Sequence, residues 1–337
     1  MKRFAPQFSQ KNMMIVRTIS YGALGITLIA LFFVYAALFG PADPNAEPEQ
    51  FVIPLDAKNE EIATRLKEEG FIKSERMLAF ALGWKLPQNT IEPGGYTISK
   101  SMTPWELASV FSLGSYLKWV VIREGTRKEE IAEILQEKLN WSNEEKENWI
   151  STHTAERPAY VEGVYFPDTY LIPKDETPAE VARRLQSKFD EKFAPFAKEA
   201  LKQNVRWTTA LKIASLIQRE AAGKADMPLI AGILWNRLLD DMKLEVDATI
   251  QYARGKTSKG WWTPITPEDK KIDSPFNTYK YKGLPPHPIA NPGINAITAA
   301  LYPKNTKCFF YIHDNRGNIH CAQTYKDHLR NINTYLK

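Results

Sequence analysis

Apolar residues follow two different patterns along this chain, and the first is a single unbroken run. Residues 19–39 contain no charged side chain. At about 1.5 Å per residue, a helix of this length would span about 30 Å, the thickness of a bilayer core. The pattern therefore predicts one transmembrane helix over 19–39, preceded by a short N-terminal segment, 1–18.

The second pattern begins after a Pro-rich, acidic segment, 40–50, which is typical of a linker and which we expect to hold the folded part off the membrane. Over 51–140, short apolar runs alternate with amphipathic stretches. They predict strands at 51–55, 96–99 and 117–123, and helices at 59–69, 74–84, after Thr103, and 128–139.

Two pieces of this region look alike. Val52-Ile53 followed by 59–63 resembles Val121-Ile122 followed by 128–132, each a strand, a turn and a helix that starts with polar or acidic residues. Small units of this kind resemble LysM-like glycan-binding modules. Two unrelated strand–helix pairs with ordinary capping would give the same pattern.

Residues 141–337 show a longer mixture of elements. Helices are expected over 142–156, 177–196, 207–220, 226–238, 295–301 and 325–335, and a hairpin is expected from strands 308–312 and 319–323. The Pro- and Gly-rich segment 283–293 suits a rigid wall, and 254–271 suits a long structured loop. The fold class predicted is α+β: a transmembrane helix, a small α/β subdomain over 51–140, and a mixed α+β domain over 141–337.

Charge and composition argue against several classes of function. The net charge is +5 with no dense basic run, which gives nucleic-acid binding little support. Neither a zinc pattern nor a nucleotide-binding motif occurs, so we expect no metal and no cofactor.

The charges around the apolar run predict its orientation. Lys2, Arg3, Lys11 and Arg17 precede it, and acidic residues follow it. The positive-inside rule then predicts a single-pass protein of the cytoplasmic (inner) membrane, with its N-terminus in the cytoplasm and the rest outside. A cleaved signal peptide is the alternative, although its apolar core would be shorter.

One carboxylate stands out in the second domain. Glu220 ends an apolar helix and is followed by small residues, Ala221, Ala222 and Gly223. Poor solvation would raise the pKa of such a carboxyl group toward working pH, so Glu220 is a candidate general acid. A helix C-terminus that happens to carry a Glu is the plainer interpretation.

Several segments together resemble the YceG-like family of endolytic murein transglycosylases, in family order over roughly residues 50–337. They are Glu162-Gly163 with 166–170, the run IASLIQREA that ends at Ala221, Asn236-Arg237-Leu238, 244–252, 277–279, 283–293 and His320.

The resemblance implies lytic cleavage of peptidoglycan between N-acetylmuramic acid and N-acetylglucosamine, which leaves a 1,6-anhydro end. The sugar's own C6 hydroxyl is then the nucleophile, so one carboxylate can act as acid and then as base. Glu220 matches the family's catalytic Glu. The family commonly has a second Glu two residues earlier, where this chain has Gln218, so Glu220 is the only acid on its helix.

The resemblance also suggests the residues that bind the glycan strand. Asp247 would organise the site or bind sugar, and a purely structural acid is an equal alternative. Trp261 and Trp262 could stack on sugar rings or anchor their loop. The other expected substrate-binding residues are Asn236, Thr249, Tyr252, Asn277, Thr278, Tyr279 and His320.

Two alternatives for function stay open. If Asp247 were a nucleophile, the enzyme would be a retaining, lysozyme-like hydrolase. A membrane-anchored, non-catalytic peptidoglycan-binding or assembly protein is the second alternative. The expected partners are peptidoglycan glycan strands and, by resemblance, membrane-bound peptidoglycan synthases. Cys308 and Cys321 lie on opposite arms of the predicted hairpin, where a disulfide is chemically permitted outside the cytoplasm but not required.

Overall fold

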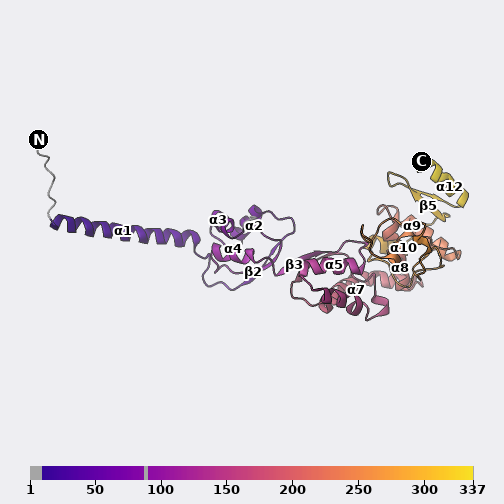
Figure 1. The fold of residues 1–337 in the computed structure, drawn as a ribbon, viewed down its shortest axis with the longest axis horizontal. Coiled ribbons are helices and arrows are strands. Elements are labelled where there is room, and N and C mark those ends of the chain that lie inside the picture. Colours follow the sequence, from indigo (N-terminus) through magenta and orange to yellow (C-terminus); the bar gives the residue numbers. More distant parts are fainter. Residues whose placement is uncertain (1–9, 87–89, 337) are drawn as a thin grey trace. The chain divides into compact units, whose positions relative to one another are not determined.

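The computed structural model describes residues 10–86 and 90–336, and the chain forms two compact units, Met1–Lys118 and Trp119–Lys337 (Figure 1). The predicted regions 51–140 and 141–337 stay a prediction, and residues 119–140 pack with the second of these compact units. The reason is that Ile131, Leu135 and Leu139 of the helix before residue 140 are buried in the core of the second unit.

The N-terminal helix α1 (Gln10–Phe39) contains the predicted apolar run. Its stretch Arg17–Phe39 is long and apolar enough to cross a membrane, and none of it is buried by the protein. The first nine residues of the predicted segment 1–18 lie outside the described residues.

The rest of the first unit is a small α/β fold. Its elements are β1 (Glu49–Ile53), α2 (Asn59–Glu68), α3 (Glu75–Lys85), β2 (Gly94–Ile98) and α4 (Pro104–Ser112). β1 and β2 are antiparallel, with Phe51 opposite Tyr96. Both rings are buried together with Phe111 of α4, so the helices cover one shared core. Thr103 caps α4 as predicted, because its hydroxyl accepts the Glu106 N–H.

Strand β3 (Leu117–Val121) carries the chain from the first unit into the second, where β4 (Thr169–Pro173) is its neighbour. Leu117 pairs with Gly95 of β2, and Ile122, just after β3, donates its N–H to the Asp168 carbonyl. The two halves of the weak strand–helix repeat thus belong to different units. The LysM-like character of the first unit stays a resemblance.

The second unit is mostly helical. Its elements after β3 are α5 (Lys128–Leu139), α6 (Asn143–Asn148), the π-helical turn η1 (Trp149–His153), the 3-10 turn η2 (Pro158–Tyr160), β4, α7 (Pro178–Lys202), α8 (Trp207–Glu220), α9 (Met227–Leu239), α10 (Asp247–Arg254), the 3-10 turn η3 (Asp269–Lys271), α11 (Ile294–Leu301), β5 (Phe310–His313), β6 (Ile319–Ala322) and α12 (Tyr325–Tyr335). The α+β class is confirmed for this part of the chain.

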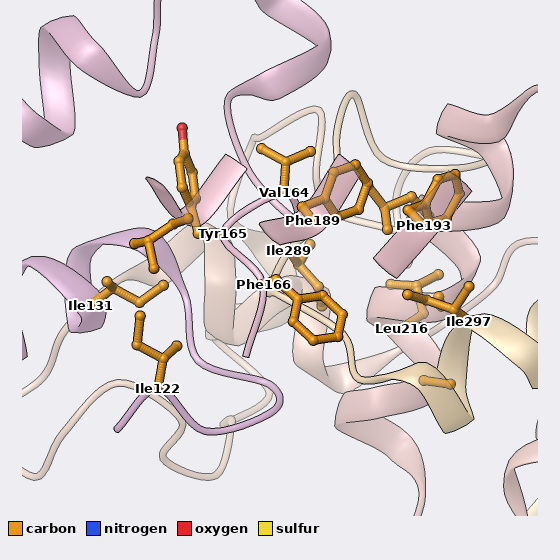
Figure 2. Close-up of a cluster of buried hydrophobic side chains, with 14 of the residues drawn as sticks. Ile122, Ile131, Val164, Tyr165, Phe166, Phe189, Phe193, Leu216, Ile289 and Ile297 are labelled. Carbon is orange, nitrogen blue, oxygen red and sulfur yellow. The ribbon is translucent and has the colours of Figure 1, made fainter. Parts of the chain in front are cut away.

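Helix α8 lies at the centre of this unit and packs against α7, α9, α10 and α11. Its buried Leu216 belongs to the same core as Val164 and Phe166 of the loop before β4, Phe189 and Phe193 of α7, and Ile289 and Ile297 (Figure 2). A helix that is enclosed on several sides has its end fixed, so the position of Glu220 follows from the core.

The Pro- and Gly-rich segment lies against α8, as its own hydrogen bonds show. Ile289 donates its N–H to the Ser215 hydroxyl at 3.1 Å, and Gly293 donates to the Gln218 side-chain oxygen at 3.0 Å. Gln218 therefore has a structural task on the helix that ends at Glu220.

The predicted C-terminal hairpin is present, with Tyr311 of β5 opposite Cys321 of β6. Cys308 and Cys321 form a disulfide, with their Cα atoms 5.9 Å apart. The pairing that the sequence left open is therefore present in the structure.

The loop before β4 is packed so tightly that it has no room for a side chain at Gly163. Its φ is +86°, and a Cβ there would lie 2.7 Å from Cβ and Cγ of Pro288. Gly283 has a similar φ of +83°, but a Cβ there would meet nothing within 4 Å. We expect Gly283→Ala to lower the free energy of unfolding by about 1 kcal/mol, the cost of the left-handed backbone alone.

Gly163→Ala should cost about 1–3 kcal/mol more than Gly283→Ala, because it also overpacks the core. Urea unfolding of the full chain in detergent, followed by tryptophan fluorescence, measures both. Equal losses in the two variants would show that Pro288 moves aside without cost.

Candidate active site

Glu220 is the last residue of α8, and the chain leaves the helix immediately after it. Ile213, Leu216 and Ile217 are buried on the helix, while Ala221 has extended backbone angles. The apolar face therefore fixes the helix, and the change of backbone direction at Ala221 leaves the Glu220 side chain at the edge of the core rather than within it.

Three groups surround the Glu220 carboxylate. The Tyr311 hydroxyl donates to Glu220 Oε2 at 2.6 Å, and the Ala248 backbone N–H also donates to the carboxylate. Ala248 is in the first turn of α10, where free N–H groups and the helix dipole favour a negative charge. Asp247, the preceding residue, is close enough to add a repulsive charge.

These contacts act on the pKa of Glu220 in opposite directions. Burial raises the pKa most, and the Asp247 charge raises it further, while the Tyr311 hydrogen bond, the Ala248 N–H and His313 lower it. The balance is a pKa above that of an ordinary glutamate. Glu220 can thus hold a proton at a higher pH than a surface carboxyl group, which a general acid needs.

The carboxylate opens into a pocket of about 390 Å³ between α9, α10 and the C-terminal hairpin. Its lining combines acids, aromatic rings and aliphatic side chains, namely Glu220, Ile233, Leu234, Arg237, Leu244, Glu245, Val246, Asp247, Tyr279, Phe310, Tyr311, Ile312, Tyr325 and His328. Within residues 10–86 and 90–336, no three His, Cys, Asp or Glu side chains are grouped to hold a metal ion.

Two of the sequence-predicted residues, Asp247 and Tyr279, line this pocket with Glu220. The Tyr279 hydroxyl donates a short hydrogen bond to Asp247 Oδ1. Burial and the Asp247 carboxylate raise the pKa of Tyr279, so its hydroxyl keeps its proton and holds Asp247 in place.

Tyr311 is a site residue that the sequence reasoning missed. The pattern predicts its strand, but not that the strand would lie beside a helix end 91 residues earlier. Helix α9 holds the strand there: Asn236 Nδ2 donates to the Thr306 and Cys308 carbonyls at 2.8 and 3.0 Å, and Arg237 Nε donates to the Phe309 carbonyl at 2.6 Å. Asn236, expected at the substrate, thus anchors the strand that carries Tyr311.

A second link joins the same hairpin to the turn after Glu220. His313 Nε2 lies 2.8 Å from Asp226 Oδ2, and that oxygen accepts the Ala222 N–H at 3.0 Å. This contact of His313 is structural, although His313 lies only two positions after Tyr311 in β5.

Three other predicted residues are buried beneath the pocket. Thr249 and Thr278 share a hydrogen bond between their hydroxyls at 2.9 Å, and Thr278 also accepts the Val246 N–H. Asn277 donates to the Lys270 and Ile272 carbonyls and accepts the N–H groups of Tyr279 and Lys280. These bonds fix the start of α10 and the loop of Tyr279; direct contact with sugar stays a prediction for all three.

Tyr252 and His320 lie outside the pocket lining. Tyr252 is buried against Phe276, with the Arg127 guanidinium 4.1 Å from its ring centroid. The His320 ring stacks on Tyr335 at 3.6 Å between centroids, and its Nε2 lies 3.0 Å from Asp314 Oδ2. Their expected roles in substrate binding stay predictions.

The paired tryptophans of the long loop are tied to α5. Trp262 Nε1 donates to Glu130 at 2.7 Å and Trp261 Nε1 to Glu133 at 3.3 Å. The Arg219 guanidinium, next to Glu220 in sequence, lies 3.9 Å from the Trp262 ring centroid. Both indoles therefore anchor the loop, and Trp262 also packs against the end of α8.

A partly buried acid of raised pKa, beside a second acid and in a pocket with several tyrosines, defines an enzyme whose site is suited to acid–base chemistry. The family model described as "YceG-like family" matches residues 51–334. The chain belongs to the YceG-like family.

Named relatives agree with this membership. The chain is 29% identical over 328 residues to the endolytic murein transglycosylase of Bacillus subtilis (strain 168), covering 90% of both chains. It is 28% identical over 327 residues to the endolytic murein transglycosylase of Streptococcus pneumoniae (strain D39), covering 87% of this chain but 59% of that relative. The crystal structure of a YceG-like protein from Listeria monocytogenes shares the fold, with a TM-score of 0.59, 24% identity, and coverage of 85% of this chain and 99% of that one.

The raised pKa of Glu220 has a consequence for stability. Below the ordinary pKa of a glutamate the residue is protonated in both states; as pH rises above it, the unfolded state ionises more readily, so folding loses stability. Glu220→Gln removes this loss but keeps an oxygen that can accept from Tyr311. We expect the melting temperature of the variant, relative to wild type, to increase as pH rises from about 4 to 8.

Thermal unfolding of both proteins across this pH range measures the difference. Glu60→Gln, at an exposed position of α2, is the matched control, and its melting temperature relative to wild type should not show this increase. A difference for Glu220→Gln that also stays constant with pH would contradict a raised pKa.

Proposed function

We propose that the chain is an endolytic murein transglycosylase. It cleaves the β-1,4 bond between N-acetylmuramic acid and N-acetylglucosamine in peptidoglycan and leaves a 1,6-anhydro-N-acetylmuramic acid end. The observation that carries the proposal is the Glu220 carboxyl group, which burial makes a weak acid and which Tyr311 and Ala248 hold at the pocket. Family membership and the names of the relatives supply the substrate class.

The chemistry needs only one carboxyl group. Protonated Glu220 donates its proton to the glycosidic oxygen as the bond from that oxygen to C1 of N-acetylmuramic acid breaks. The C6 hydroxyl oxygen of the same sugar then bonds to C1, and the Glu220 carboxylate takes the hydroxyl proton. The enzyme ends in its starting state, and no water is consumed.

Tyr311 and the Ala248 N–H both act on the charged form of Glu220 in this cycle. Between the two proton transfers Glu220 is an anion in a desolvated place, and both donors stabilise that anion. The Tyr311 hydroxyl also orients the carboxyl group through its bond to Oε2. Asp247, fixed by Tyr279, raises the pKa of Glu220 and organises the sugar site.

The membrane topology is part of the same proposal. Helix α1 anchors the chain in the cytoplasmic membrane, with the N-terminus in the cytoplasm and residues 40–337 outside. The Cys308–Cys321 disulfide supports this side, because disulfides persist in oxidising compartments. A glycan-cleaving site tethered there meets new glycan strands as they are made. We propose membrane-bound peptidoglycan synthases as its partners. The enzyme then trims or terminates the strands that these synthases make.

Product analysis is the main test of the reaction. We expect the full chain, in detergent, to release fragments with 1,6-anhydro ends from isolated sacculi, detected by mass spectrometry. Glu220→Gln should lower the rate by at least about 10³-fold, because the amide cannot donate or accept the proton. Retained binding of Glu220→Gln to sacculi shows that the loss is chemical.

The alternatives give different products. Reducing ends in place of anhydro ends would mean a hydrolase, with Asp247 as the nucleophile. No fragments from the wild-type chain, with binding intact, would mean a non-catalytic peptidoglycan-binding protein.

The Tyr311 hydrogen bond predicts a change in the pH profile. This bond lowers the pKa of Glu220, so its removal in Tyr311→Phe should raise that pKa. Because the first step needs protonated Glu220, the alkaline limb of kcat/KM should move up by about one pH unit. The maximum rate should fall about tenfold as the carboxylate loses its orientation.

Tyr325→Phe is the matched control, since it removes a hydroxyl from the same pocket. Its alkaline limb should stay in place. An unchanged limb in Tyr311→Phe would assign Tyr311 a purely structural role.

A further inference from the structure

Helix α3 of the first unit has two apolar faces, and only one of them is covered. Leu78, Ala81 and Leu82 are buried in the core of the unit. On the outer side, Phe80 is 51% exposed and Trp84 is 74% exposed. The two rings are four residues apart, so they lie next to each other on the helix surface. Large exposed aromatic side chains that adjoin in this way indicate an interaction surface.

This outer face is continuous with the end of α1. The Phe39 ring, at the last residue of α1, lies 6.3 Å from the Phe80 ring and 6.2 Å from Trp105 of α4 between centroids, and Phe80 and Trp105 are 5.8 Å apart. Tyr35, one turn earlier in α1, stacks on Phe39 at 5.1 Å. The aromatic rings thus run from the end of the apolar helix onto α3 and α4.

Backbone contacts hold the end of α1 at this place. Strand β1 begins at Glu49, so the connecting segment ends at Pro48. Within it, Asp43 donates its N–H to the Lys100 carbonyl at 3.0 Å, and the Ala46 carbonyl accepts the Ser99 hydroxyl at 2.7 Å. The segment predicted to hold the folded part off the membrane is therefore bonded to that folded part.

Cationic side chains flank the aromatic face. Arg76 and Lys85 are exposed on α3, and Lys73 is exposed just before it. Aromatic rings at the level of lipid headgroups, with Lys and Arg around them, are typical of protein segments that lie in a membrane interface.

We infer that this aromatic face of the first unit, Phe80 and Trp84 with Trp105 and Phe39, docks onto the lipid headgroups of the membrane that α1 crosses. The inference rests on the membrane anchor proposed above. A bilayer surface is favoured over a glycan strand because Phe39 ends the membrane-spanning stretch and belongs to the same aromatic cluster. The folded part of the first unit is then held to the membrane by two contacts, the helix α1 and this face.

Spin labelling tests the docking without any need for catalysis. The chain has only two cysteines, and both are in the disulfide, so an added cysteine can be labelled selectively. Gly83→Cys places a nitroxide beside Trp84, where an added Cβ meets nothing within 4 Å. Glu60→Cys on exposed α2 is the matched control. Each full-length variant is reconstituted into liposomes that contain anionic lipid.

We expect collisions with a water-soluble nickel chelate to be several-fold rarer for the label at 83 than for the label at 60, and collisions with oxygen to be more frequent. Adding Phe80→Ser and Trp84→Ser should return the label at 83 to the values of the control. The reconstituted protein is also tested for release of fragments from sacculi. A failure of the enzymatic proposal is therefore detected independently of the docking.

Three results would overturn the inference. The first is equal nickel accessibility at 83 and 60 in protein that floats with the liposomes. The second is protein that does not float with them, which would remove the anchor as well. The third is a label at 83 that becomes protected only when soluble glycan strands are added, which would make the face a sugar-binding surface.

Discussion

The hydrogen bond from Tyr311 to Glu220 joins two parts of the chain that are 91 residues apart. Burial of the Glu220 carboxyl group would leave its charged form without solvation, and this bond, with the Ala248 N–H, compensates for part of that loss. The site therefore depends on three elements that must all be in place: the end of α8, the start of α10 and strand β5. Each contributes at least one group, and none of them forms the site alone.

Much of the second unit serves to hold these elements together. Asn236 and Arg237 of α9 fix the backbone before β5, and the disulfide closes the hairpin. On the other side of α8, Ser215 and Gln218 fix the Pro-rich segment. Deeper in the core, the buried Glu162 carboxyl group accepts a hydrogen bond from Asn291 Nδ2 at 2.8 Å. Polar side chains in this unit thus tie passing chain segments to its helices and to one another.

The family's recognisable segments divide into two groups in the structure. Glu220, Asp247 and Tyr279 line the pocket. Thr249, Asn277 and Thr278 are buried and bonded to one another or to backbone, although nothing in the sequence separates them from Tyr279. Periodicity shows that a residue is near apolar neighbours, but it does not show how many of its hydrogen-bonding groups are already used.

The sequence by itself determined the apolar N-terminal helix, most helices and strands other than α10 and β4, the C-terminal hairpin, and Glu220 as the acid to consider. These features follow from local patterns of apolar spacing, capping and turn residues. Only the tertiary structure decided where the compact units divide, which groups surround the Glu220 carboxylate, and that an aromatic face lies beside Phe39. These depend on which distant segments pack together, and no local pattern along the chain contains that information. The pKa of Glu220 belongs to the second group, because burial and Tyr311 act on it only once the core has formed.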